Sequence, residues 1–138
     1  MFSFKKEFDN NNTYYEQGYN TDSIPSIFIH GVGLDNTMWY PQKKKFENRS
    51  VIFYDILNHG KSKNGYKKLN FDDFNDQLNN LLKYIQVDKV NLIGFSIGAL
   101  IAQHFTSRHT AKINRLVLIG SVYKRSEEQV KIVKNRYE

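Results

Sequence analysis

One serine lies between two glycines at residues 94–98, where the sequence reads Gly94-Phe95-Ser96-Ile97-Gly98. The residues Val90–Phe95 before the serine are apolar and partly β-branched, as in a buried strand, and Ile97–Ser107 has the composition of a helix. A serine on so sharp a turn exposes its hydroxyl, and only glycine leaves room for the backbone two positions away on either side. The pattern therefore predicts Ser96 as a nucleophile that attacks an acyl carbon.

A second glycine-containing loop follows an earlier strand. Ser26–His30 is short and apolar, and Gly31, Val32 and Gly33 come directly after it. Backbone N–H groups in such a loop can stabilise the negative charge that forms on a carbonyl oxygen under attack. We expect the N–H groups of Val32 and Ile97 to serve as oxyanion donors, with Gly33 as a further candidate.

A nucleophilic serine needs a base, and the four histidines are poorly placed for that role. His104 is expected about 12 Å along the helix that follows the serine, and His109 near the opposite edge of the sheet. His30 and His59 precede the serine and belong to loops at its own edge of the sheet. A base must come within about 3 Å of the hydroxyl or reach it through one water. No carboxylate directly follows the last predicted strand, so the catalytic triad is expected to be incomplete.

Strands and helices alternate along the chain, which is typical of a mostly parallel sheet with helices on both faces. Asn70 is expected to cap a helix that carries apolar residues on one face through Ile85. Ser126 and Gln129 have the spacing of a capping box and predict the start of a last helix. The expected strands are Phe2–Phe8, Thr13–Gln17, Ser26–His30, Val51–Asp55, Val90–Phe95 and Arg115–Gly120.

The composition excludes several classes of protein. The 138 residues include no cysteine, so a disulfide framework and a thiolate metal site are excluded, and a cytoplasmic location is expected. The net charge of +6 comes mostly from scattered lysines, so no nucleic-acid partner is expected. The most apolar stretch, Leu92–Ala102, is too short to span a membrane, and no signal peptide is recognisable. We expect no membrane contact, no cofactor and no metal.

Four motifs together resemble the α/β-hydrolase superfamily in their order and spacing. They are SIFIHGVG, FYDILNHGKS, LIGFSIGALIA and RLVLIG, and the resemblance extends from the first strands to Tyr137. It is nearest to the capped esterase and lactonase branch, which includes 3-oxoadipate enol-lactone hydrolases. The resemblance implies that residues 1–125 form the N-terminal part of an α/β-hydrolase-type core. Residues 126–138 would be the start of a cap helix that is interrupted. The resemblance also implies roles for Ser96 as nucleophile, Val32 and Ile97 as oxyanion donors, and Gly94, Phe95 and Gly98 as parts of the nucleophile elbow.

Two features depart from the family pattern. The motif D-x-R-G-x-G-x-S is usual after the fourth strand, whereas this chain has Leu57 and Asn58 in place of Arg and Gly. Asparagine tolerates the left-handed conformation that glycine would adopt, so the turn can survive. The family order is Ser, then Asp or Glu, then His, and the two later residues are missing. We therefore expect the first half of a serine hydrolase, truncated before its last strands, that acts on a small-molecule ester, thioester or lactone but is inactive alone.

Two other functions stay open on the sequence alone. A non-catalytic binding remnant of the same fold would also be inactive, but it should protect the edge of Arg115–Gly120, whose LVLIG run carries no charge. A dinucleotide-binding oxidoreductase would use Gly31-x-Gly33-x-x-Asn36 after a strand and would place Asp55 on a ribose hydroxyl. Asn36 is large for that loop, and the dinucleotide hypothesis gives no account of Gly94–Gly98.

Overall fold

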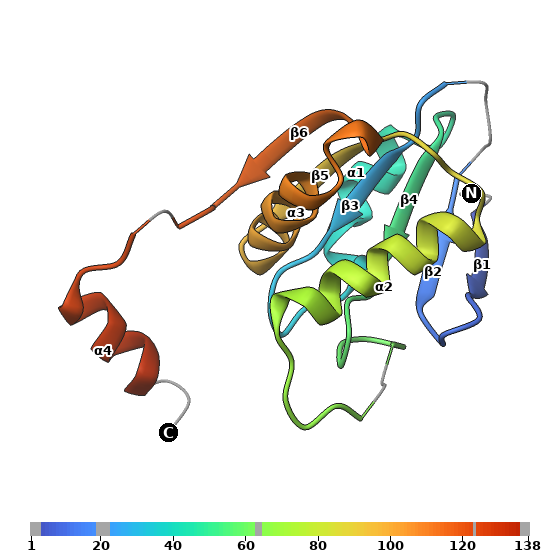
Figure 1. The fold of residues 1–138 in the computed structure, drawn as a ribbon. Coiled ribbons are helices and arrows are strands. Elements are labelled where there is room, and N and C mark those ends of the chain that lie inside the picture. Colours follow the sequence, from blue (N-terminus) through green and yellow to red (C-terminus); the bar gives the residue numbers. More distant parts are fainter. Residues whose placement is uncertain (1–3, 19–22, 63–64, 123, 136–138) are drawn as a thin grey trace.

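The computed structural model describes residues 4–18, 23–62, 65–122 and 124–135. Within them, six strands form one sheet in the order β1-β2-β4-β3-β5-β6 (Figure 1). β1 and β2 run antiparallel to their neighbours, whereas β4, β3, β5 and β6 are mutually parallel. The strands are Lys5–Phe8 (β1), Tyr14–Gln17 (β2), Ser26–Ile29 (β3), Val51–Tyr54 (β4), Val90–Phe95 (β5) and Ile113–Ile119 (β6).

Helices cover both faces of this sheet, as the alternating pattern predicts. Side chains alternate along β3, so Ile27 and Ile29 pack in one apolar cluster and Phe28 in the other. The first cluster joins the sheet to α2 and α3, and the second joins it to η1 and α1. The helical segments are Asn36–Trp39 (η1), Tyr40–Lys45 (α1), Phe71–Tyr84 (α2), Ile97–Arg108 (α3), Thr110–Lys112 (η2) and Glu127–Asn135 (α4).

The predicted capping box at Ser126 and the predicted N-cap at Asn70 both form, and Asn70 also belongs to a capping box. The Asp73 N–H donates to Asn70 Oδ1, and the Asn70 N–H donates to Asp73 Oδ2. At the start of α4 the Gln129 N–H donates to Ser126 Oγ, and the Ser126 N–H donates to Gln129 Oε1. Where the structure describes them, the strand boundaries lie within two residues of the predicted ones, and those of β5 are as predicted. Residues 1–3 and 136–138, which belong to the first predicted strand and the last predicted helix, lie outside the described residues.

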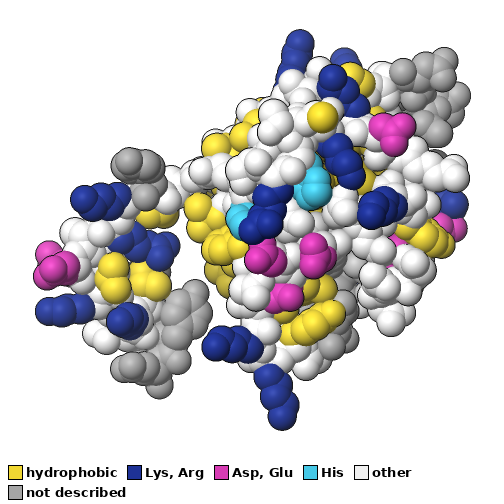
Figure 2. Space-filling model, viewed as in Figure 1, with side chains coloured by type: hydrophobic (Ala, Val, Ile, Leu, Met, Phe, Trp, Pro, Cys, Tyr) yellow, Lys and Arg dark blue, Asp and Glu magenta, His cyan; other side chains and the backbone are white. Residues whose placement is uncertain are grey.

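The sheet is exposed at its β6 end. β6 pairs with β5 alone in the described part of the chain, and Val117, Leu118 and Ile119 are all exposed although they alternate between the two faces. α4 projects away from the sheet (Figure 1), and none of its described residues is buried. Figure 2 shows apolar side chains exposed at this end of the molecule, whereas Lys and Arg are spread over the visible face rather than gathered. Among the described residues, every helix is too short or too polar to cross a bilayer.

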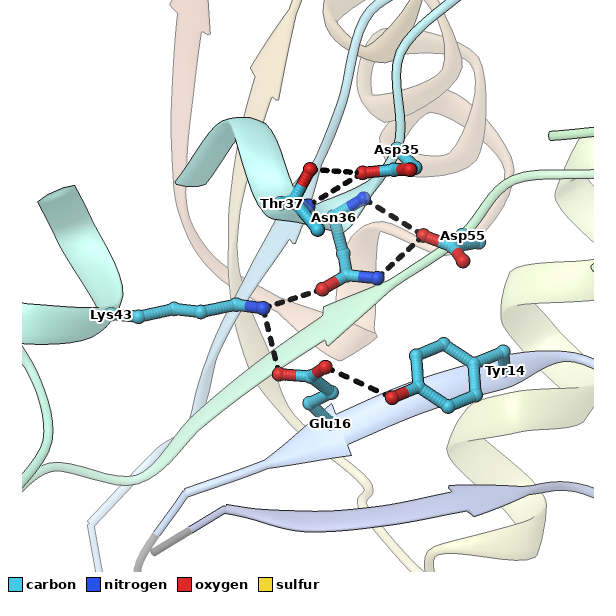
Figure 3. A network of polar contacts seen from close by, with 7 residues as sticks. All are labelled: Tyr14, Glu16, Asp35, Asn36, Thr37, Lys43 and Asp55. Atoms are coloured by element: carbon cyan, nitrogen blue, oxygen red, sulfur yellow. Dashed lines mark hydrogen bonds and ion pairs between the residues drawn. The ribbon is translucent and has the colours of Figure 1, made fainter. Parts of the chain in front are cut away.

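A buried polar network joins β2, η1, α1 and the end of β4 (Figure 3). Lys43 Nζ lies 2.7 Å from Glu16 Oε2, and less than a tenth of either side chain is exposed. Glu16 Oε1 accepts a hydrogen bond from the Tyr14 hydroxyl at 2.9 Å. Lys43 also donates to Asn36 Oδ1, and the Asn36 side-chain amide donates to Asp55 Oδ1 at 2.8 Å. The buried charges are therefore paired and hydrogen-bonded, which is the condition for tolerating them inside a protein.

Replacing one partner of this ion pair should lower the free energy of unfolding more than replacing both partners does. Lys43→Met leaves the Glu16 carboxylate buried without its cation, which typically costs about 3–5 kcal/mol. The double variant Lys43→Met with Glu16→Gln removes both charges and should recover most of that loss. Urea unfolding followed by circular dichroism measures both values. A single variant within about 1 kcal/mol of the wild type would show that the ion pair contributes little to stability.

Candidate active site

Ser96 lies at the junction of β5 and α3, in a conformation that few non-glycine residues adopt. Its φ is 56° and its ψ is −117°. The Ser96 N–H donates to the Ile119 carbonyl of β6 at 2.9 Å, and the Ser96 carbonyl accepts from the Ala99 N–H at 3.0 Å. The strained residue is thus held from both sides, by the neighbouring strand and by the first turn of α3.

The two glycines of the motif stand where a side chain could not fit. A Cβ atom at Gly94 would overlap the carbonyl oxygen of Gly98, and one at Gly98 would overlap the carbonyl oxygen of Ile29. Both contacts are with backbone, which cannot rotate away as a flexible side chain would. The close approach of α3 to β5 and β3 therefore depends on these two glycines.

The loop after β3 lies at the same edge of the sheet as Ser96. β3 and β5 pair in parallel with Ile29 opposite Gly94, so both chain segments leave the sheet side by side. Phe95 lies against this loop, because a Cβ atom at Gly31 would come within 2.9 Å of its ring. The predicted oxyanion donors Val32 and Ile97 are thus on adjacent segments. The Gly33 N–H already donates to His59 Nε2 at 2.9 Å, so this third candidate has a partner within the protein.

His30 and His59 have both ring nitrogens engaged with backbone groups. His30 is fully buried; its Nε2 accepts from the Ile56 N–H at 3.0 Å and its Nδ1 lies 2.8 Å from the Gly31 carbonyl. Burial lowers the pKa of His30, and the Gly31 carbonyl and the Asp55 charge oppose that shift. The ring contacts of both histidines go to backbone of the two loops, so they serve the loops rather than the Ser96 hydroxyl.

The two histidines that follow Ser96 in the sequence, His104 and His109, make contacts with helices α2 and α3. His104 Nε2 is 3.0 Å from Asp72 Oδ1 on α2, and Arg108 binds the same carboxylate at 2.8 Å. The ring of His109 packs over Phe105, with 4.5 Å between the ring centroids. His109 is not the simple surface residue that a position at a helix end suggests, because its Nε2 is buried. These contacts fix both rings along the body and far end of α3.

Asp55 connects the loop after β3 with the loop after β4, a role that the sequence did not reveal. It is fully buried, and its Oδ1 accepts from the Asn36 N–H at 2.8 Å while its Oδ2 accepts from the Lys61 N–H at 2.9 Å. Both oxygens of this carboxylate already accept hydrogen bonds from the protein, so the structure gives no support to the dinucleotide hypothesis. Asn58 has a φ of 61°, as expected for a residue in place of the family's glycine.

A cavity of about 840 Å³ opens beside the same loops. Gly33, Asp35, Asp55 and His59 belong to its wall, together with Tyr14 and Glu16 of β2. Ser96 is not among its lining residues, so we do not take this cavity as the place where an acyl substrate would bind.

Relief of the strain at Ser96 should stabilise the protein. Glycine adopts a positive φ without a steric cost, so Ser96→Gly should be more stable than Ser96→Ala by about 1 kcal/mol, since strain of order 1–3 kcal/mol is partly offset by the greater chain entropy of glycine. The two variants lack the same hydroxyl, which makes them a matched pair in urea unfolding. Equal stabilities would show that the backbone at this position is not strained.

The burial of His30 should make stability depend on pH. Its pKa in the folded protein is lowered from the ordinary 6.5, so the unfolded chain binds a proton more readily and stability falls as the pH drops below about 6.5. The slope from one such group is at most about 1.4 kcal/mol per pH unit. The variant His30→Gln keeps an acceptor but does not titrate. Urea unfolding at pH 7.5 and 5.5 should therefore show that the free energy of unfolding falls more for the wild type than for His30→Gln. An equal fall in both proteins would contradict this role of His30.

Comparison with known proteins identifies the family. The family described as alpha/beta hydrolase fold matches residues 25–137. The chain is 32% identical over its whole length to (E)-2-((N-methylformamido)methylene)succinate hydrolase of Acinetobacter baylyi, of which it spans 52%. It is 31% identical over 71% of its length to a non-heme chloroperoxidase of Kitasatospora aureofaciens, of which it spans 37%.

A solved hydrolase from Pseudomonas aeruginosa shares the fold, with a TM-score of 0.82 over 98% of this chain and 52% of its own, at 17% identity. The chain thus spans about half or less of the length of these relatives. Its sheet order, its strand–serine–helix junction and the family match agree. The chain belongs to the α/β-hydrolase superfamily and covers the N-terminal part of that fold.

Proposed function

We propose that this chain provides the nucleophile of a serine hydrolase, and that Ser96 attacks the carbonyl carbon of an ester, thioester or lactone. The observation that carries the proposal is the strained backbone of Ser96 between β5 and α3, which two close-packed glycines make possible. A strained residue persists only where its surroundings hold it, and such residues gather at functional sites. The Ser96 oxygen forms a bond to the acyl carbon as the bond from that carbon to the leaving oxygen or sulfur breaks, and the leaving group takes up a proton. Water then hydrolyses the acyl-serine ester, which releases the carboxylic acid and restores the serine hydroxyl.

The oxyanion donors in this proposal are the N–H groups of Val32 and Ile97. Ile97 is the first residue of α3, where a backbone N–H has no acceptor within the helix. Val32 lies in the loop beside Ser96, and about half of its surface is exposed. Gly33 remains only a further candidate for an oxyanion donor, because its N–H is bound to His59.

The proton of Ser96 needs an acceptor that the described residues do not place beside it. His30, His59, His104 and His109 all have other contacts in the structure. We propose that the catalytic acid and histidine belong to a part of the fold that the relatives have and this chain does not span, and that residues 126–138 begin a cap. The 138-residue chain alone is then inactive. A cytoplasmic location likewise stays a prediction from the absence of cysteine.

The substrate is proposed as a class and not as a compound. The names of the relatives include a hydrolase and a chloroperoxidase, so they do not agree on one reaction. The resemblance to the esterase and lactonase branch favours a small acyl substrate.

The test compares the 138-residue chain with a chain extended by the in-frame coding sequence that follows it, each as Ser96 and as Ser96→Ala. The extended chain should cleave a p-nitrophenyl ester, and Ser96→Ala should lower its kcat/KM by about 10³-fold or more. The 138-residue chain should react with a fluorophosphonate probe far more slowly than the extended one, with circular dichroism confirming that both are folded.

Two outcomes would change the proposal. Rapid ester cleavage by the 138-residue chain, abolished in Ser96→Ala, would show that a base is present within it. A coding sequence that stops without adding a strand followed by Asp and a later loop with His would favour a non-catalytic binding module. The exposed apolar residues of β6 argue against such a module, because an evolved edge strand is normally covered or charged.

A further inference from the structure

Two histidines connect the loop after β3 and the loop after β4 in a reciprocal way. His30, in the first loop, accepts the Ile56 N–H of the second at 3.0 Å. His59, in the second loop, accepts the Gly33 N–H of the first at 2.9 Å. The two rings lie 5.4 Å apart between centroids.

These contacts define the protonation of both rings. A backbone N–H can only donate, so Nε2 of each histidine must be an unprotonated acceptor. Nδ1 then carries the hydrogen and donates to a backbone carbonyl, that of Gly31 for His30 and that of Leu57 for His59, each at 2.8 Å. A protonated ring would present a second N–H to a backbone N–H, and the contact would be lost.

Only one of the two rings is open to solvent. His30 is fully buried, whereas His59 is half-buried and forms part of the wall of the 840 Å³ cavity. The charged and titratable groups around that cavity are Tyr14 and Glu16 of β2, Asp35 of the first loop, Asp55 at the end of β4 and Lys61 of the second loop, with the His30 ring beside His59. Protons can therefore reach His59 from bulk water.

Gly33 is held in the loop by this bond and by the turn around it, in which the Leu34 N–H donates to the Gly31 carbonyl at 3.2 Å. It has a φ of 73°, and no atom lies within 4 Å of where its Cβ would be. Further along the loop, Asn36 is held separately by the Asp55 carboxylate at 2.8 Å. The Gly33 nitrogen belongs to the peptide unit directly after Val32, so a bond to it restricts the backbone of Val32 as well.

We propose that His59 is a positioning residue whose neutral ring holds Gly33, and through it the backbone of Val32, and releases both when it is protonated. This inference rests on the proposed function in one respect, namely that the Val32 N–H is an oxyanion donor. His59 touches neither the serine nor a substrate in this role. It keeps the donor loop in place and makes that placement dependent on pH.

The test follows the exchange of the Gly33 amide with water by NMR, in the full 138-residue chain between pH 5.5 and 8. In the wild type, protection of Gly33, corrected for the intrinsic rate, should fall about fivefold or more as the His59 ring signals titrate, which is the scale of one hydrogen bond. The Asn36 amide, bound to Asp55, is the internal reference and should not follow that titration.

Two variants separate the bond from the charge. The side chain of His59→Gln can accept the Gly33 N–H but cannot titrate, so protection should stay high and independent of pH. His59→Ala should lose protection at Gly33 at every pH while Asn36 keeps it. Protection in the wild type that stays flat through the His59 titration would overturn the proposal, and so would unchanged protection in His59→Ala. If His59→Ala does not fold, the comparison of wild type with His59→Gln decides.

Exchange at Gly33 does not require Ser96 to react, so the two proposals can fail separately. Absence of Ser96-dependent activity in the extended chain would refute the hydrolase proposal and leave the His59 contact intact. In an active extended chain, His59→Ala should lower kcat more than it raises KM, and His59→Gln should restore most of kcat, because only the oxyanion donor is disturbed.

Discussion

The strained backbone of Ser96 is the constraint that the surrounding strands and helix have to satisfy. A residue with φ of 56° and ψ of −117° is costly for any side chain, and it persists because β5 and α3 are both packed around it. Gly98 lets α3 begin directly against the carbonyl of Ile29, which in turn requires β3 to be the neighbour of β5. The buried residues Ile101 and Phe105 then anchor α3 on the sheet. The geometry of one residue therefore depends on the strand order and on the core of one whole face.

Hydrogen bonds from buried side chains hold the loops at that edge of the sheet. Their backbone N–H groups would be costly if left buried without partners. Asp55 and His30, which are both fully buried, accept hydrogen bonds from three of these N–H groups. The ion pair of Glu16 and Lys43 joins the same network, because Lys43 donates to the Asn36 side chain that is bound to Asp55. Side chains rather than regular secondary structure thus define the shape of this edge.

The sequence predicts best what is decided by neighbouring residues. The Asn70 cap, the bounds of β5 and the strand–serine–helix junction all follow from spacings of a few residues, and each is found close to its predicted place. α1 was missed because six residues that include Pro41 and three lysines show no apolar period. Lys43 looks like one of three solvated lysines until the fold brings it to Glu16, which is 27 positions away. The histidine contacts join residues 26 positions apart, and no local pattern distinguishes an acceptor for a distant N–H from an ordinary loop histidine.

The open edge of the sheet bears directly on Ser96, the proposed nucleophile. The Ser96 N–H is bound to the Ile119 carbonyl at the end of β6, the strand that has only one neighbour in the described part of the chain. Strands at an edge open more readily than strands inside a sheet, because fewer contacts must break. Every opening of β6 removes one of the contacts that hold the strained residue, and the exposed side chains Val117 and Ile119 give little apolar burial to prevent it. A strand that paired with β6 and covered those side chains would therefore act on the geometry of Ser96 without touching it. If the proposed hydrolase is right, the part of the fold that this chain does not span would do more than supply an acid and a base, because it would also stabilise the strand whose carbonyl binds the Ser96 N–H.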